Sequence, residues 1–137
     1  MKKYEIAKKK TLTPEIGQIS VYAPLVAAKA KAGQFIILRV NEQGERIPLT
    51  IADFDRQRGS VTVIAQTVGA TTELLAAKQE GEFIADFVGP LGVPTHTEGL
   101  KKVAVVGGGV GCAIAYPVAK KLHQQGAEVH SIVGRCV

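Results

Sequence analysis

The sequence predicts a six-stranded antiparallel β-barrel followed by the first β-α-β unit of an α/β domain. Up to about Gly92, short segments alternate apolar and polar residues with period two, which is typical of half-buried strands. Beyond Gly99, an apolar segment runs through glycines into an amphipathic helix, which is typical of a buried parallel strand and its crossover. We therefore expect the barrel to occupy residues 1–98 and an incomplete second domain to occupy residues 99–137.

Six strands account for the alternation in the first part. In the segment IGQISVYA, Ile19 and Val21 share one face while Gln18 and Ser20 share the other. The same pattern recurs between turn-forming residues, so strands are expected at 4–11, 16–23, 34–40, 46–53, 60–66 and 81–88. Their near-regular spacing favours a closed antiparallel barrel. One helix is expected at 71–77, where a threonine can cap the first N–H groups.

The second part contains one strand, one helix and one further strand. Strands are expected at 103–106 and 128–133, with a helix between them whose apolar residues recur every four positions up to about Gly126. Because a proline beyond the first turn costs a helix roughly 3 kcal/mol, Pro117 suggests that the helix begins near Ala113. Two strands cannot cover both faces or pair both edges of a sheet. The sequence therefore predicts a fragment, or a sheet completed by something else, with self-association as the favoured outcome.

Composition narrows the function classes. The formal net charge of +5 suits an anionic ligand such as a dinucleotide or an acidic partner, although ordinary solvated lysines explain it equally well. Scattered positive charge with four Phe, three Tyr and no Trp disfavours nucleic-acid binding. The basic N-terminus lacks a following apolar stretch, and the longest uncharged stretch is too short to span a bilayer, so a cytoplasmic protein is expected. Cys112 and Cys136 lack ligand spacing, so no metal site is expected in this chain.

A glycine-rich loop is the first candidate site. It joins a strand to a helix, so its backbone N–H groups can approach a phosphate at the positive end of that helix. The candidate residues are Gly107, Gly108, Gly109 and Gly111. The dinucleotide fingerprint is incomplete because Cys112 stands at its third position, and a structural glycine turn is the alternative. Arg135 ends the second strand where an acidic residue would hold a ribose, which favours NADP.

Two further candidate sites lie within the barrel. Arg46, Pro48, Leu49 and Thr50 share one strand, so a cation and a hydroxyl could bind the diphosphate and ring of one long cofactor. A second helix N-terminus follows some twenty residues later, with the candidates Gly69, Thr71 and Thr72. Taken alone, Arg46 is as readily a surface arginine, and Thr72 is more readily a plain helix cap. His96, His123 and His130 are isolated, and no catalytic acid–base residue is assigned.

Four motifs, in this order and spacing, resemble the ferredoxin-reductase-like flavoproteins, in particular the electron-transfer subunits related to dihydroorotate dehydrogenase and to NADH-dependent ferredoxin:NADP reductase. The motifs are RIPLTIAD, VGATTELL, GPLG at 89–92 and VAVVGGGVGCAIAYPVAKKL, and together they cover essentially the whole chain. The resemblance implies an FAD-binding barrel and a Rossmann-like NAD(P)-binding domain. It implies flavin contacts from Arg46, Pro48, Leu49, Thr50, Ile64, Ala65, Gln66, Gly69, Thr71 and Thr72.

The resemblance further implies an oxidoreductase that passes electrons from NAD(P)H to FAD, then to a [2Fe-2S] centre and a larger catalytic subunit or a ferredoxin-type carrier. The cysteines that would hold the cluster are expected only in a missing C-terminal part, so the fragment alone is expected to be inactive. The chain departs from the family at Ile47, where relatives usually carry the arginine, and at Ala65, where they often carry tyrosine. The alternatives are a docking subunit that has lost its cofactor and a piece of a generic dinucleotide-binding dehydrogenase.

Overall fold

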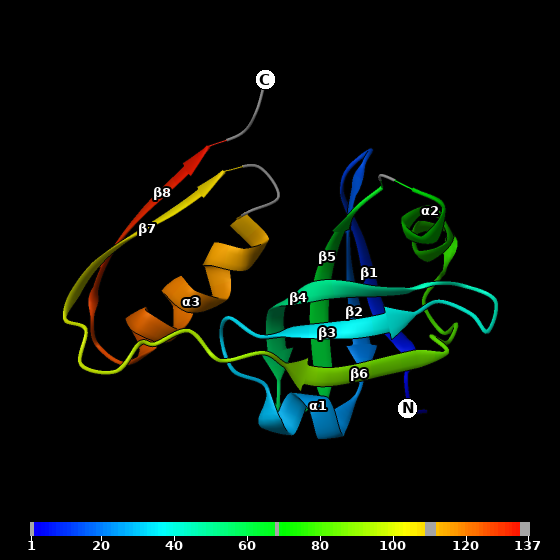
Figure 1. The fold of residues 1–137 in the computed structure, drawn as a ribbon, viewed down its shortest axis with the longest axis horizontal. Helices are drawn as coiled ribbons and strands as arrows, with labels where there is room; N and C mark the ends of the chain where they lie inside the picture. The colour runs from blue at the N-terminus through cyan, green and yellow to red at the C-terminus, as the bar shows by residue number, and fades with distance from the viewer. Residues whose placement is uncertain (1, 68, 109–111, 135–137) are drawn as a thin grey trace.

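The computed structural model describes residues 2–67, 69–108 and 112–134, which form two sheets and three helices (Figure 1). The antiparallel sheet has the order β1-β2-β5-β4-β3-β6, and the parallel pair is β7-β8. The strands are β1 Ile6–Thr13, β2 Ile16–Tyr22, β3 Phe35–Arg39, β4 Arg46–Asp55, β5 Ser60–Gln66, β6 Asp86–Leu91, β7 Lys102–Gly108 and β8 Glu128–Gly134. The helices are α1 Pro24–Lys29, α2 Ala70–Ala77 and α3 Cys112–Gln124.

The period-two pattern builds the core of the six-stranded sheet. On β2, Ile19 and Val21 are buried while Gln18 and Ser20 are half-exposed, as the alternation predicts. The inward residues of all six strands meet in one apolar cluster. Its largest fully buried side chain is Phe87 on β6, which also contacts the ring of Tyr4 with 6.2 Å between centroids. Removal of these side chains from water is the main source of the barrel's stability.

The barrel is closed by a loop instead of by a strand ladder. Strands β1 and β6 stand at opposite ends of the sheet order and do not pair. An isolated bridge joins Glu5 to Phe83, and the Ile6 N–H donates to the Glu82 carbonyl at 2.8 Å. The predicted fold class, an antiparallel six-stranded barrel followed by a β-α-β unit, is confirmed. The expectation of a fully closed sheet is wrong, since β6 starts at Asp86, after the bridging segment.

One helix was not expected from the sequence. Helix α1 begins with Pro24 at its first turn, where the fixed φ of proline suits a helix and its missing N–H is no loss. Val26 and Ala27 are buried against the barrel. Six residues are too few to show helical periodicity, so Pro24 was the only sequence signal for this element.

The β-α-β unit lies beside the barrel. Helix α3 contacts β7, β8 and also β4, so it lies between the parallel pair and the barrel (Figure 1). It begins at Cys112 and contains Pro117, close to the expected start. Among the described residues, one face of the parallel pair is uncovered, as expected for two strands with a single helix. Val106 on β7 is 69% exposed and Val133 on β8 is 71% exposed, because α3 covers only one face of the pair.

We predict that Phe87→Ala destabilises the barrel by roughly 3–5 kcal/mol, because it removes a fully buried aromatic ring and leaves a cavity. Urea unfolding of the chain measures the change. The neighbouring Val88→Ala, at a side chain that is 51% exposed, should shift stability by about 0.5 kcal/mol or less. Equal losses in the two variants would contradict the placement of the core.

Candidate functional site

Strand β4 pairs with two different neighbours in succession. Its first half pairs with β3, from Arg46 opposite Arg39 to Thr50 opposite Phe35. Its second half pairs with β5, from Ile51 opposite Val63 to Asp55 opposite Ser60. The residue pair Thr50 and Ile51 therefore marks the point where β4 changes partner.

The end of β5 continues without β4. Residues 64–66 pair with 16–18 of β2, and no ladder connects them to the first half of β4. The two strands diverge beyond this point, as Figure 1 shows. The backbone edges that residues 46–50 and 64–66 turn toward each other are therefore not joined by a ladder, and we call this unpaired junction the opening between β4 and β5. The predicted residues Ile64, Ala65 and Gln66 all lie on this edge, so the structure brings this part of the candidate set together with Thr50.

The first half of β4 presents two different faces. Ile47 and Leu49 pack against the apolar core, whereas Arg46 and Pro48 are exposed and Thr50 is half-exposed. Leu49 was predicted together with the other three, but its side chain faces the core because strand residues alternate. Arg46 and Thr50 share the outer face, about 13 Å apart at a rise of roughly 3.3 Å per residue. Because the arginine stands at position 46 and not at position 47, its side chain lies on the same face of β4 as the Thr50 hydroxyl.

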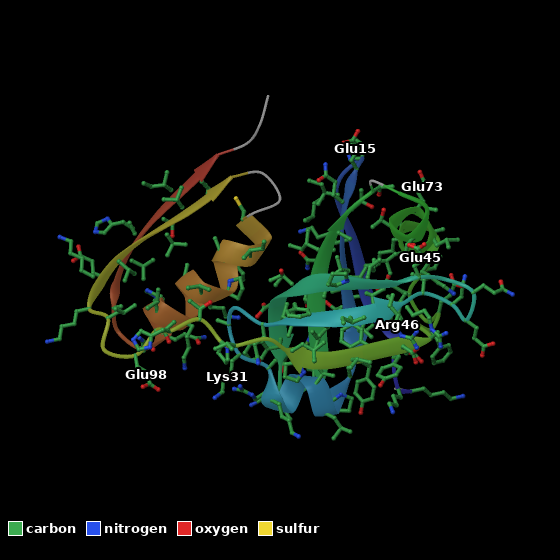
Figure 2. The ribbon with its side chains drawn as sticks, in the orientation of Figure 1. Glu15, Lys31, Glu45, Arg46, Glu73 and Glu98 are labelled. Carbon is green, nitrogen blue, oxygen red and sulfur yellow. The ribbon has the colours of Figure 1, made fainter. Side chains whose placement is uncertain are left out.

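Arg46 belongs to a cluster of three charges. Its Nη2 lies 3.3 Å from Asp86 Oδ2, and Arg39 Nη2 lies 2.8 Å from the same oxygen. The Arg46 side chain is 62% exposed and projects from the start of β4, as labelled in Figure 2. Two guanidinium groups share one carboxylate, so the cluster keeps one net positive charge. This charge stands at one end of the outer face of β4.

Helix α2 begins directly after the diverging end of β5. The Gly69 N–H donates to Thr72 Oγ1 at 3.0 Å, and the same hydroxyl donates to the Gly69 carbonyl at 3.0 Å. Thr72 therefore caps the N-terminus of α2, which is the alternative to a flavin contact that the sequence left open. Gly69 is exposed and extended, with φ of −167°, and a Cβ there would meet nothing within 4 Å. Neither packing nor backbone conformation requires glycine at this position. Thr71 is half-buried in the first turn.

Ala65 and Thr72 also border a small cavity of about 180 Å³ between the β1–β2 hairpin and α2. Lys9 from β1 lies at the same cavity, and its Nζ donates to the carbonyls of Ala76 and Lys78 at the C-terminal end of α2. A cation at that end complements the helix dipole. The cavity wall is thereby held in place by Lys9.

The glycine segment after β7 is only partly described. A Cβ on Gly107 would lie 3.1 Å from Cys112 Cα and 3.3 Å from Ala115 Cβ, so the absence of a side chain here allows the close contact between strand and helix. Gly108 is exposed, and a Cβ there would meet nothing within 4 Å. Packing against α3 therefore explains Gly107, in line with the alternative of a structural glycine turn. Packing does not explain Gly108, because the space beside it is open. Gly109, Gly111 and Arg135 lie outside the described residues.

A contact between β4 and α3 was not anticipated from the sequence. Lys120 Nζ donates to Asp53 Oδ1 at 2.8 Å. This hydrogen bond raises the pKa of Lys120 above the ordinary value of a lysine, and the charges of Asp53, Tyr116 and Asp55 act in the same direction against partial desolvation. The pair borders a polar groove of about 1060 Å³ between the barrel, residues 93–98 and α3, and the groove contains none of the predicted binding residues.

Within the described parts of the chain, no group of three or more His, Cys, Asp or Glu side chains is placed to hold a metal ion. The same residues contain no helix long and apolar enough to cross a membrane.

Comparisons with known proteins find similar proteins, some of which are named for electron transfer. It is 51% identical over 96% of its length to a Clostridium beijerinckii protein named only for the adh 3' region, and covers 47% of that protein. It is 42% identical over 95% of its length to a Thermotoga maritima protein named dihydroorotate dehydrogenase B (NAD(+)), electron transfer subunit homolog, and covers 46% of it. The chain spans about half the length of the curated relatives it matches.

A solved structure agrees over nearly all of the chain. The structure of the NADH-dependent reduced ferredoxin-NADP oxidoreductase, described for flavin-based electron bifurcation, has a TM-score of 0.95 and 40% identity. The match covers 98% of this chain and 49% of the other. No protein-family model matches the sequence. The chain is thus a homologue of the dihydroorotate dehydrogenase B electron transfer subunits and has the ferredoxin-reductase-like fold.

Proposed function

We propose that this chain is the flavin-binding module of an NAD(P)H-linked oxidoreductase, and that it passes electrons from a pyridine nucleotide through FAD to a partner subunit. The observation that carries the proposal is the opening between β4 and β5, found in a chain 42% identical to an electron transfer subunit homolog. The names of the two most informative relatives refer to electron transfer, NADH and ferredoxin. The domain boundary is proposed at 98/99, between the barrel and the unit that contains β7, α3 and β8.

The residues around the opening fit an FAD molecule. The unpaired backbone edges of 46–50 and 64–66 offer donors and acceptors to a flat polar ring, and Thr50 adds a hydroxyl. The net positive charge around Arg46 and the N-terminus of α2 offer two sites for the diphosphate. Gly69 keeps the approach to that helix end free of side-chain atoms. Bound FAD would supply the hydride- and electron-accepting chemistry, and the chain would bind and orient it.

The second unit is proposed to hold part of the pyridine nucleotide. Gly108 leaves open space before the N-terminus of α3, which is where a phosphate is favoured. The sequence preference for NADP rests on Arg135 and stays a prediction. A [2Fe-2S] centre, a larger catalytic subunit and a ferredoxin-type carrier belong to the proposal for the whole protein, which in the relatives is about twice as long. Self-association through the exposed face of β7 and β8 also stays a prediction.

A second function is favoured by one specific observation. Arg46 already engages Asp86, and Leu49 faces the core, so two of the four β4 candidates are committed to the fold. A barrel that docks a partner without holding flavin would show this arrangement. Titration with FAD distinguishes the two functions, because only the first predicts saturable binding and quenching of flavin fluorescence.

We predict that Gly69→Asp weakens FAD binding by about tenfold or more without destabilising the chain. Aspartate is a favourable N-cap residue, and the open space around Gly69 accepts its side chain. Its negative charge, however, repels a diphosphate at the helix end. Fluorescence titration of flavin-free protein measures the affinity, and urea unfolding measures the stability.

Gly69→Asn is the matched control, since it has the same shape and capping ability without the charge. It should lose less affinity than Gly69→Asp at equal stability. Identical affinities for Gly69→Asp and the unmodified chain would show that no diphosphate lies at α2. Absence of FAD binding by the unmodified chain would instead support the docking function.

We predict that the FAD-loaded chain is reduced only slowly by NADH and by NADPH. Two strands and one helix provide a small part of a pyridine-nucleotide domain, so the nicotinamide is poorly positioned. Stopped-flow absorbance at the flavin band measures the rate, with dithionite as the control that shows the flavin is reducible. Rapid reduction by either nucleotide would mean that the 137 residues already hold a complete pocket.

A further inference from the structure

A β-bulge in β4 turns Asp53 away from the core. Before the bulge, odd-numbered residues such as Ile47 and Leu49 face inward. The register then shifts between Ile51 and Asp53, and Ile51 and Ala52 are both buried at 0% and 2% exposure. An undisturbed alternation would have placed Asp53 inside with Ile51. The bulge reverses the phase, as bulges commonly do where a side chain must be redirected.

The redirected carboxylate meets a cation from α3. Asp53 Oδ1 accepts hydrogen bonds from Lys120 Nζ at 2.8 Å and from the Phe54 N–H at 2.9 Å. The bond from the Phe54 N–H orients the Asp53 carboxylate independently of the lysine. Lys120 also lies over the Tyr116 ring of its own helix, with 5.9 Å from Nζ to the centroid. Each partner is therefore oriented by a neighbour on its own element, Asp53 by the Phe54 N–H and Lys120 by the Tyr116 ring.

A second contact holds the other end of the helix. Gln125, immediately after α3, donates from Nε2 to the carbonyl of Thr97, a residue that is only 6% exposed. Thr97 belongs to the segment that leads from the barrel to β7. The helix is thus attached to β4 by Lys120 and to the connecting segment by Gln125.

The attachment joins the two halves of the proposed site. Asp53 lies three residues after Thr50 on the strand that borders the flavin opening. Lys120 lies on the helix whose first residue, Cys112, packs against Gly107, a buried residue near the end of β7. A rotation of α3 about its contact with β4 would move the N-terminus of this helix relative to Thr50. The distance between flavin and nucleotide therefore depends on this contact.

We propose that Asp53 and Lys120 form a positioning pair that fixes helix α3, from its first residue Cys112, relative to the flavin strand β4. The proposal rests on the proposed function for its consequence, but its geometry is independent of any bound cofactor. Neither residue touches the reacting atoms, so the pair acts by orientation alone. Neutralising the pair should leave flavin affinity unchanged. It should lower the fraction of molecules in which α3 is packed against β4.

The size of the effect follows from the exposure of the pair. The two side chains are 38% and 40% exposed, and exposed ion pairs shift an equilibrium by about 1.4- to 5-fold. Charge reversal at Lys120 exceeds this, because it replaces attraction by repulsion from Asp53 and from nearby Asp55. Lys121 gives the matched control. It is an exposed lysine on the same groove with no carboxylate partner among the described residues.

Residual dipolar couplings of the backbone amides, measured on the ¹⁵N-labelled 137-residue chain in an aligning medium, test the pair without attached tags. The couplings report whether the barrel and residues 102–134 share one alignment tensor. We expect one common tensor in the unmodified chain and in Lys121→Glu. In Lys120→Glu the second unit should show a separate, smaller tensor, and the double variant Asp53→Lys with Lys120→Glu should restore the common tensor.

Lys120→Gln provides a milder variant should Lys120→Glu fail to fold. In Lys120→Gln the alignment tensor of residues 102–134 should be reduced less than in Lys120→Glu. A common tensor in both Lys120 variants would overturn the proposal, and so would an equal loss in Lys121→Glu or the lack of restoration in the double variant. FAD titration of the same proteins separates this result from the proposed function. Absence of FAD binding by the unmodified chain would reject the proposed function and leave the tensor result interpretable.

Discussion

The change of partner along β4 is the constraint on which the rest of the structure depends. A strand of ten residues cannot pair with β3 and β5 over its whole length when those strands diverge. It pairs with β3 up to Thr50 and with β5 from Ile51, and the bulge at Ala52 absorbs the mismatch. The opening left between β4 and the end of β5 is a direct result. It exposes backbone groups inside a sheet, where they are normally paired, and such groups favour a polar ligand.

The same bulge links the opening to the second unit. By reversing the alternation it buries Ile51 and Ala52 and presents Asp53 to Lys120 of α3. One irregularity in one strand therefore shapes the proposed flavin site and orients the neighbouring helix. Close packing of Gly107 against Cys112 and Ala115 then joins the start of α3 to the end of β7. Hydride transfer between two cofactors depends on holding them at a fixed distance, and our proposal assigns that purpose to the contacts along β4 and α3.

Much of the fold could be predicted because its signals are local. Alternation located five of the six strands closely and placed the sixth at 81–88, where β6 runs from Asp86 to Leu91. The apolar run with glycines located β7 and α3. Three features were missed because they depend on tertiary structure. Helix α1 is too short for periodicity, and closure of the barrel through Glu5 and Phe83 needs the three-dimensional path of a loop. The bulge is hidden in the segment IAD, so the faces of Leu49 and Asp53 could not both be read from a simple alternation.

The central claim is that the opening between β4 and β5 binds FAD. Titration of the isotope-labelled chain with FAD, followed by amide chemical-shift mapping, tests it most directly. The account predicts saturable shifts at residues 46–50, 64–66 and 69–72. Shifts confined to the polar groove around 53–58, 93–98 and 120–125 would contradict it, as would the absence of any saturable change.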